Sequence, residues 1–314
     1  MTTIDQGMIP FYTTQFTQRL ELLLQQKGSK LRGRVEESTG YVGKLVSPVN
    51  QIGAIKSRAP KGRFAPKTNT VQDYVRRWLT PQDRVIEQLY DNFDQLRTIV
   101  DPKSMATQNA AYACGRDWDD AVIAAATGTA LIGQDASSLT TESFVTSSFQ
   151  VAANFGAAAA TGLTVAKMIE ARRILRHYEN DLENDPVTIV IGSQQESDLL
   201  KQVQVTSAEY NAEIAKNTVL VDGKVTRFVG MDVVVMERLP QTTLNTTRGV
   251  LVFVRSGLHL GLWQEVKTQI FQRPDLEGNP WDVSTVHTFG ATRTQPGKVL
   301  QVLCADTSGA PIDP

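Results

Sequence analysis

The sequence predicts an α+β fold in which helices from the first two thirds of the chain pack against strands that dominate the last third. The first observation is the segment from Phe228 to Cys304, where β-branched and aromatic residues alternate with polar ones in three strand-rich pieces. Such alternation is typical of strands with one buried and one exposed face. The second is the helical spacing of apolar residues over 108–127 and 164–178. No nucleophile, metal-ligand cluster or phosphate loop interrupts the strands, which favours a structural role.

Composition is close to that of an average globular protein. The chain has 314 residues, of which 41% are hydrophobic and 21% charged, enough for one large domain or two ordinary ones. No apolar run reaches the roughly 18 residues that span a bilayer, and the first ten residues lack the layout of a secretory signal. We therefore expect no membrane partner. Cys114 and Cys304 are the only cysteines, which suits a reducing cytosol and gives no disulfide framework.

Charge is unevenly distributed along the chain. The net charge is −1, too low for a chain that grips nucleic acid along its whole length. Residues 27–67, however, hold ten Lys or Arg against two acids. Three interpretations stay open for this segment: contact with nucleic acid, contact with an acidic patch on a neighbouring subunit, and a solvated surface loop. Aromatic residues for base stacking are limited there to Tyr41 and Phe64, which disfavours single-strand binding.

The N-terminal segment predicts an arm followed by a hairpin. Residues 16–26 fit a short amphipathic helix, with Phe16 and Leu20 on its apolar stripe and Gly28 as its C-terminal cap. This helix would dock on a neighbour or serve as a mobile arm. Residues 32–69 are rich in Gly, Pro, Lys and Arg and hold few large apolar residues. We expect an extended hairpin lying on another surface, with a disordered linker as the alternative.

The middle of the chain predicts helices. Thr80-Pro81 is expected to open the first, because proline is tolerated in the first helical turn. An alanine-rich helix then covers 108–127, a surface loop or short hairpin 128–162, and a second long helix 164–178. Arginines in the last half of that helix suit its dipole.

An acidic run at 179–185, closed by Pro186, ends the second long helix and forms the clearest boundary in the chain. A buried strand is expected at 187–191. Ser193 to Glu196 then fits a capping box that opens a helix reaching Val203. Another short helix is expected at 208–215, before the strand-rich region.

No residue is predicted to be catalytic, cofactor-binding or metal-binding. His177, His259 and His287 lie far apart, and none has a partner at metal-ligand spacing. Ser193 sits between a strand and a helix, but the Gly-x-Ser-x-Gly pattern of a nucleophile elbow fails on both sides. The acidic run lacks the central glycine and distant glutamate of a calcium loop. With no phosphate-binding glycine motif either, we expect no cofactor and no enzyme activity.

Several degenerate motifs occur in a particular order in the second half of the chain. They are Arg227–Met236 with Leu239-Pro240, Gly249–Phe253 with Leu260–Leu262, Arg273–Asp275, Phe289–Arg293 and Lys298–Cys304. Together with the arm, hairpin and helices before them, they resemble the major capsid protein of tailed bacteriophages. That family has the lambdoid-type capsid fold, which it shares with encapsulin shells. The resemblance covers nearly the whole chain.

The resemblance implies a domain organisation. The implied parts are an N-terminal arm at 1–40, an extension loop at 41–75, a peripheral domain at 76–185 and 263–295, an axial domain at 186–262 and 296–306, and a C-terminal tail at 307–314. Helix 164–178 would be the long spine helix of the peripheral domain. Some family members join a loop lysine to an asparagine of a neighbour; nothing in this sequence establishes such a bond, and we do not predict one.

The resemblance also implies a function. The chain would be a structural subunit that self-assembles, as hexamers and pentamers, into an icosahedral head around double-stranded DNA. It would assemble in the host cytoplasm and reside in the virion, with portal, scaffold or decoration proteins as further partners. The candidate residues for contact between subunits are Lys44, Lys56, Arg58, Lys61, Arg63, Lys67, Phe16 and Leu20. Three alternatives stay open: an encapsulin-type protein compartment, an α/β enzyme that uses Ser193, and a nucleic-acid-binding module in the N-terminal third.

Overall fold

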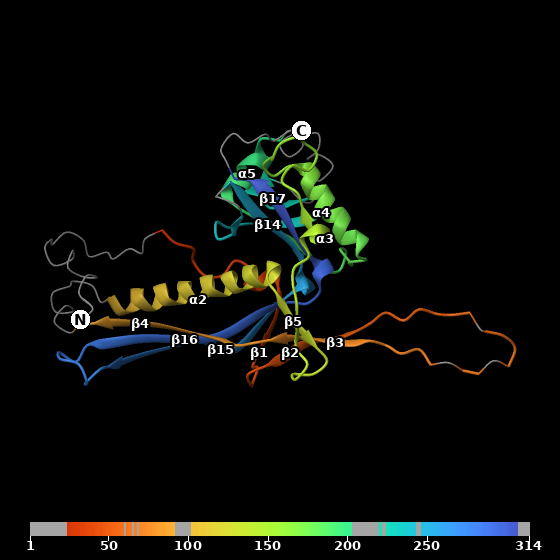
Figure 1. Cartoon of the computed structure of the whole chain (residues 1–314). Coiled ribbons are helices and arrows are strands. Elements are labelled where there is room, and N and C mark those ends of the chain that lie inside the picture. The colour runs from red at the N-terminus through yellow and green to blue at the C-terminus, as the bar shows by residue number, and fades with distance from the viewer. Residues whose placement is uncertain are drawn as a thin grey trace.

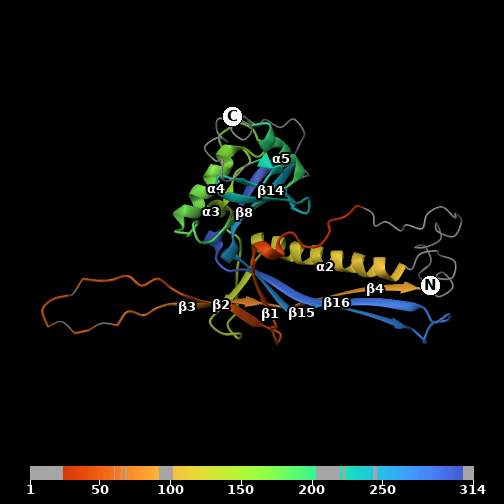
Figure 2. The same ribbon diagram turned by 180° about the vertical axis from the view of Figure 1, so that it is seen from behind.

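The computed structural model describes residues 24–59, 61–64, 66–67, 69–91, 102–202, 220–221, 224–242 and 246–306. A compact body stands on a long, thin body, and a narrow hairpin projects from the junction (Figure 1). The view from behind shows the hairpin on one side and the long sheet, with the helix that covers it, on the other (Figure 2). The molecule is thus L-shaped with an added hairpin, and both the long body and the hairpin extend away from the compact body.

The compact body is built on a seven-stranded sheet. Its strands run in the order β11 (Arg227–Phe228), β12 (Met231–Val235), β8 (Val187–Ile191), β14 (Thr247–Val254), β17 (Val299–Ala305) and β7 (Gln150–Val151), with β13 (Gln241–Thr242) paired to β14. Helices α3 (Thr146–Phe149), α4 (Val165–His177) and α5 (Ser193–Leu200) accompany it. Helix α4 buries Met168, Ala171 and Leu175 against one face of the sheet. All five residues of β8 are buried, as expected for a central strand with both faces covered.

The long body is a four-stranded sheet under one long helix. The strand order is β1 (Glu36–Thr39), β15 (Leu258–Gln272), β16 (Trp281–Arg293) and β4 (Gln82–Tyr90). Helix α2 (Pro102–Thr127) lies along one face (Figure 1). Its residues Trp118 and Val122 share a hydrophobic cluster with Phe289 of β16 and with Leu251 and Phe253 from the far face of the seven-stranded sheet. One continuous core therefore joins the two bodies.

A third sheet forms the root of the projecting hairpin. Its order is β2 (Val46–Ile52), β3 (Tyr74–Leu79), β5 (Ala130–Gly133) and β6 (Thr140–Glu142). The ladder continues one step beyond β2, where the Gly53 N–H donates to the Asp73 carbonyl at 2.7 Å. Among the described residues, the remaining elements are the pair β9 (Leu220–Val221) and β10 (Lys224–Val225) and the 3₁₀ turns η2 (Arg32–Arg34), η3 (Arg255–Gly257) and η4 (Pro296–Lys298).

The helix predicted to open at Thr80-Pro81 is wrong. The segment that follows is strand β4, which pairs antiparallel with β16 along its whole length, from Gln82↔Phe289 to Tyr90↔Trp281. Proline at position 81 also suits a break between two strands, because it donates no N–H to a ladder. Thr80-Pro81 is compatible with either a helix or a strand after it, and pairing with a strand about 200 residues away decides for the strand.

The assignment of residues 164–178 as the spine helix of the peripheral domain is also wrong. That helix, α4, packs against the seven-stranded sheet and contacts β17 and β7. The helix that lies on β15 and β16 is α2. It is twice as long, with 26 residues against 13, and its small side chains Ala106 and Ala110 are buried. Small residues let a helix approach closely.

The predicted domain boundary between 262 and 263 falls inside strand β15. The sequence pattern changes there because residues 258–262 are buried on both faces, whereas the rest of the strand alternates and becomes exposed. Register shifts between Leu262 and Lys267 mark the same place. The predicted arm likewise ends inside the sheet, since Glu36–Thr39 pairs in parallel with 259–262. The chain passes between the bodies at η3 and η4 instead, where the Thr294 N–H donates to the Gly257 carbonyl at 3.0 Å.

The cap of helix α5 lies one residue earlier than predicted. Gly192, not Ser193, is the N-cap of α5, and its N–H donates to Oε1 of Gln195 at 3.2 Å. Glycine has no side chain to complete the reciprocal bond, so only half of the motif is present. The predicted helix 208–215, residues 16–23 of the predicted arm helix and the tail 307–314 lie outside the described residues.

Candidate intersubunit surfaces

We call the projecting hairpin the extension hairpin (residues 44–76), and most of its described side chains are exposed. Every described residue from Ile52 to Val71 is exposed. Among them are large apolar side chains, with Phe64 at 96% and Val71 at 88% of full exposure. Isolated exposed apolar residues are ordinary, but a whole ribbon of them is typical of a contact surface.

The extension hairpin is also strongly basic. From Lys44 to Gln72 the sequence holds six Lys or Arg and no acid. At the tip, the guanidinium of Arg63 lies 5.6 Å from the centre of the Phe64 ring, so the charge and the apolar surface are side by side. This ribbon is suited to a partner surface that combines carboxylates with apolar side chains.

The root of the extension hairpin is firmly attached to the long sheet. The Tyr41 ring packs on Trp263 with centroids 5.4 Å apart, and its hydroxyl lies 2.9 Å from Nε2 of His259. The Trp263 Nε1–H donates to the Gly43 carbonyl at 2.8 Å. A side chain at Gly261 would collide with Tyr41 and Leu79. The direction in which the hairpin leaves the body is therefore set by close packing rather than by a free loop.

A buried carboxylate fixes the end of the N-terminal arm to helix α2. Asp119, fully buried, accepts hydrogen bonds from Nε2 of Gln26, Oγ of Ser29, and the backbone N–H groups of Lys30 and Leu31, at 2.5 to 3.0 Å. At Gly115, a Cβ would lie 2.5 Å from the Ser29 nitrogen. We call this contact the arm anchor, and it fixes residues 26–31 to helix α2.

Strand β4 presents a second candidate surface on the face of the sheet opposite α2. Because His287 faces α2 and pairs with Arg84, the alternate residues of β4 point the other way. They are Asp83, Val85, Glu87 and Leu89, all exposed. Acidic and apolar side chains thus alternate along an edge strand. We call these four residues the β4 stripe.

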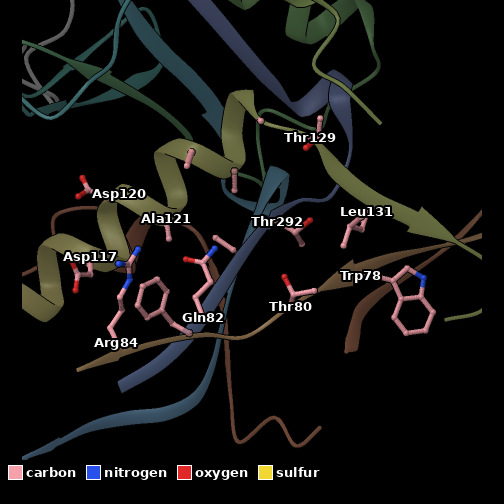
Figure 3. A pocket seen from close by; sticks show the side chains of 15 residues that line it. Trp78, Thr80, Gln82, Arg84, Asp117, Asp120, Ala121, Thr129, Leu131 and Thr292 are labelled. Atoms are coloured by element: carbon pink, nitrogen blue, oxygen red, sulfur yellow. The ribbon is translucent and has the colours of Figure 1, made fainter. Parts of the chain in front are cut away.

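A groove of about 620 Å³ runs between α2 and the strands on its side of the sheet. Figure 3 shows Gln82 and Arg84 reaching towards Asp117 and Ala121 of the helix. The helical wall is made mainly of small residues, and the groove is open to solvent. Charges of both signs line it, since Arg84 faces Asp117, and Asp120 is paired with Arg238. It has no concentrated charge or enclosed space for a cofactor.

One polar cluster was missed by sequence reasoning. The Cys114 Sγ lies 3.3 Å from Nδ1 of His287, and Nε2 of the same ring lies 3.4 Å from a carboxylate oxygen of Asp117, without the geometry of a hydrogen bond. The imidazole stacks on Phe289 at 5.1 Å. Cys114 and Asp117 are three residues apart on one helix face, but the histidine is 173 residues from the cysteine. No local spacing could reveal it.

This Cys–His–Asp cluster is not arranged as a nucleophile. Burial raises the pKa of Cys114 to about 11 and lowers the pKa of His287. At neutral pH the thiol therefore keeps its proton and the imidazole is uncharged, whereas a reactive cysteine needs a thiolate. Both side chains are fully buried. The cluster instead bonds α2 to β16.

Ser193 does not stand in a catalytic arrangement either. Its backbone N–H donates to Oε1 of Glu237 at 2.5 Å, and none of its described contacts is to a histidine. Within the described ranges, no group of three or more His, Cys, Asp or Glu side chains is placed to hold a metal ion. Nor does any helix there have the length and apolar character to cross a membrane.

The compact body contains a buried lysine and a buried aspartate. The Lys167 ammonium is held by the carbonyls of Ala153, Thr161, Gly162 and Leu303, at 2.9 to 3.1 Å. Burial lowers its pKa. Nearby Asp198 has one oxygen without a partner, and burial raises its pKa. The lysine ties the loop before α4 to β17, which keeps this part of the body rigid.

Comparison with known proteins identifies the family of this chain. A model of the Phage capsid protein family matches residues 9–306. The chain belongs to this family. A comparison with curated proteins gives no match.

Solved capsid structures share the fold of this capsid subunit. The capsid of Cyanophage P-SCSP1u superposes with a TM-score of 0.69 at 13% identity, covering 96% of this chain and 95% of that one. The capsid of Ralstonia phage GP4 gives 0.69 at 10% identity, with 95% and 96% covered. The asymmetric unit of the Cyanophage Pam1 capsid gives 0.66 at 12% identity, with 97% and 98% covered. The predicted α+β capsid fold and the structural role in a phage head are confirmed.

In this capsid subunit, the predicted contact residues fall into two groups. Lys44, Lys56, Arg58, Lys61, Arg63 and Lys67 all lie exposed on the extension hairpin. Phe16 and Leu20 lie outside the described residues. The contact role of all eight stays a prediction. The β4 stripe and the arm anchor were not predicted, although the alternation of acidic and apolar residues from Asp83 to Leu89 was a readable strand signal.

Proposed function

We propose that the chain assembles with further copies of itself, as hexamers and pentamers, into an icosahedral phage head that encloses double-stranded DNA. The extension hairpin of each copy joins it to a neighbour. The observation that carries this proposal is the ribbon of exposed apolar and basic side chains from Ile52 to Val71. In both views the backbone of this hairpin projects away from the rest of the subunit (Figures 1 and 2).

The β4 stripe is the surface that suits the hairpin best. Carboxylates of Asp83 and Glu87 would meet the Lys and Arg side chains of the hairpin, while Val85 and Leu89 would meet its apolar residues. Opposite charges at an interface select partner and register more than they add affinity. Affinity would come from apolar burial, at about 1.5–3 kcal/mol for each large side chain. A closed shell repeats this heterologous contact around every symmetry axis.

Charge reversal tests this proposal directly. Glu87→Lys places a cation in the β4 stripe, and we expect it to prevent shell formation while the subunit stays folded. Glu183→Lys is the matched control, because Glu183 is also an exposed acid but lies in the acidic turn of the compact body. Negative-stain microscopy gives the yield of shells, and circular dichroism checks folding. Normal shells from the Glu87 variant would refute the proposed docking surface.

A second experiment tests the wider function. Replacing residues 56–67 by a short turn removes the hairpin tip but keeps its paired root. We expect a folded subunit that forms no shells. Normal particles from this variant would contradict assembly through the hairpin and the assigned role of its lysines and arginines.

The finer details of the function are supported more indirectly. The subunit catalyses no reaction, an inference supported by the neutral, buried state of its Cys–His–Asp cluster. It assembles in the host cytoplasm, with portal, scaffold or decoration proteins as further partners. Nucleic acid rather than protein cargo inside purified particles would separate a phage head from an encapsulin-type compartment.

A further inference from the structure

Strand β4 is an edge strand of the long sheet. It pairs with β16 over nine residues without a bulge, and no strand in the described ranges pairs with its other side. Its outward N–H and C=O groups therefore form a row that can pair with another chain. Residues 82–90 contain no proline or glycine that would interrupt a further strand. A long edge of this kind is a template for strand addition.

The extension hairpin contains a backbone run that also lacks a ladder. Its ladder ends at the hydrogen bond between Gly53 and Asp73. Within the described part of the hairpin beyond that bond, no backbone hydrogen bond joins 54–57 to 69–72. Strand β2, which leads into the first of these runs, is itself at the edge of its sheet. Residues 52–58 thus provide a continuous open edge, in line with β2.

We propose that residues 52–58 of one copy add to the free edge of β4 in a second copy as an antiparallel strand. This inference rests on the proposed function, and it specifies how the hairpin binds at the β4 stripe. Main-chain hydrogen bonds between the two edges hold the strands together, and the side chains select the register.

The charges of the two segments favour one register. In it, Arg58 lies opposite Asp83, and Lys56 lies opposite Val85. Cβ atoms of opposed residues are about 4.5–5.5 Å apart, and diagonal neighbours about 7–8 Å, within reach of a long side chain. The Lys56 ammonium can therefore reach the carboxylates of Asp83 and Glu87 on either side of Val85. Both cations of the segment meet acids on the face that carries the β4 stripe.

The apolar residues agree with the same register. Ile52 lies opposite Leu89 on the stripe face. Ile55 lies opposite Ile86 on the other face. In the single subunit, the side chains of Ile52 and Ile55 are 62% and 58% exposed, so strand addition buries apolar surface that the subunit alone leaves in water.

Other arrangements of the same segment match less well. A shift by two residues along β4 places Ile55 opposite Gln88. A parallel strand that keeps Ile55 opposite Ile86 places Ile52 opposite the carboxylate of Asp83. Of these three arrangements, the antiparallel strand in the first register is the one that satisfies both charge and apolar burial.

Disulfide cross-linking in assembled particles tests the pairing. Two double variants place thiols at directly opposed positions, Ile55→Cys/Ile86→Cys and Ser57→Cys/Arg84→Cys. Opposed residues of a ladder lie within the Cα separation that a disulfide spans. The matched control is Ile55→Cys/Val85→Cys, whose thiols would lie on opposite faces of the sheet and point apart. The native chain, whose two cysteines are buried, gives the background.

Each chain is assembled, oxidised and run on a denaturing gel without reductant. For both opposed pairs we expect loss of most of the monomer band and a ladder of covalent multimers, because every chain contributes one hairpin and one β4. The control should stay monomeric. Shells in which either opposed pair fails to link, or in which the control links as readily, would overturn strand addition in this register while the proposed assembly stands.

The same oxidation of the concentrated, unassembled chain separates the two proposals. Any variant that forms no shells is judged by this reaction. If the native chain forms no shells but both opposed pairs link in solution, strand addition stands and assembly into a head is refuted. If it forms no shells and the opposed pairs do not link, both proposals fail.

Discussion

Removal of the Asp119 carboxylate should detach the N-terminal arm from helix α2. In the variant Asp119→Ala, the N–H groups of Lys30 and Leu31 lose their acceptor, while the side chains of Gln26 and Ser29 can turn to water. An unpaired backbone N–H in such a setting costs about 1–3 kcal/mol. Two of them give an expected loss of about 3 kcal/mol in the free energy of unfolding.

Urea unfolding of the unassembled chain, followed by tryptophan fluorescence, measures this loss. Trp118, one of four tryptophans, precedes the anchor residue, and the Arg32 guanidinium lies 4.7 Å from its ring centre, so part of the fluorescence signal comes from beside the arm. Asp120→Ala is the matched control, because that carboxylate is exposed and bonded only to Arg238 among its described contacts. A surface ion pair contributes about 0–1 kcal/mol. If the two variants lose the same stability, the arm anchor does not hold the arm.

Three further predictions concern buried titratable side chains. Lys167→Met removes the ammonium from four carbonyls. Those of Ala153 and Thr161 keep a backbone donor, whereas those of Gly162 and Leu303 lose their described donor, so the free energy of unfolding in urea should fall by about 2–4 kcal/mol; a loss below 1 kcal/mol would show that the amine is dispensable. Burial lowers the pKa of His259, which faces Tyr41 and Glu36, and of His287, which faces Cys114, Asp117 and Arg84. Their contribution is therefore complete above pH 6.5, the unfolded value, and is lost as the pH falls below it by up to about 1.4 kcal/mol per pH unit for each. Urea titrations from pH 7.5 to 5 should show this slope, and His287→Gln should reduce it; an unchanged slope contradicts the assignment. Asp198 has the opposite sign, because its pKa is raised and its stabilising effect is lost as the pH rises through the folded value. Asp198→Asn should therefore equal or exceed the native stability at pH 7, and a clear loss there would refute this reasoning.

Local sequence patterns correctly predicted those elements for which the tertiary contacts favour the same secondary structure as the sequence around them. The strand 187–191 and the helix 165–177 follow from their own apolar spacing, and both are present. Strand β4 depends instead on pairing with β16. Because β16 is about 200 residues away in the sequence, the residues around Pro81 give no sign of this pairing. The spine helix was misassigned for the same reason, because two amphipathic helices look alike until the sheets that they cover are known.

Surfaces were predicted less completely than elements. The basic hairpin was visible because charge composition is a property of the sequence alone. The arm anchor joins Asp119 to residues about 90 positions earlier, so only the structure brings these residues together.

Strand β17 has a consequence for synthesis of the subunit. It lies between β14 and the short last strand β7 of the seven-stranded sheet, and its residues Leu300 and Val302 complete the core under α4. Long-range strand pairs of this kind form slowly. The compact body therefore cannot close until residue 305 has emerged from the ribosome, whereas the extension hairpin is made early. A growing chain would thus expose the extension hairpin before the sheet of its compact body is complete.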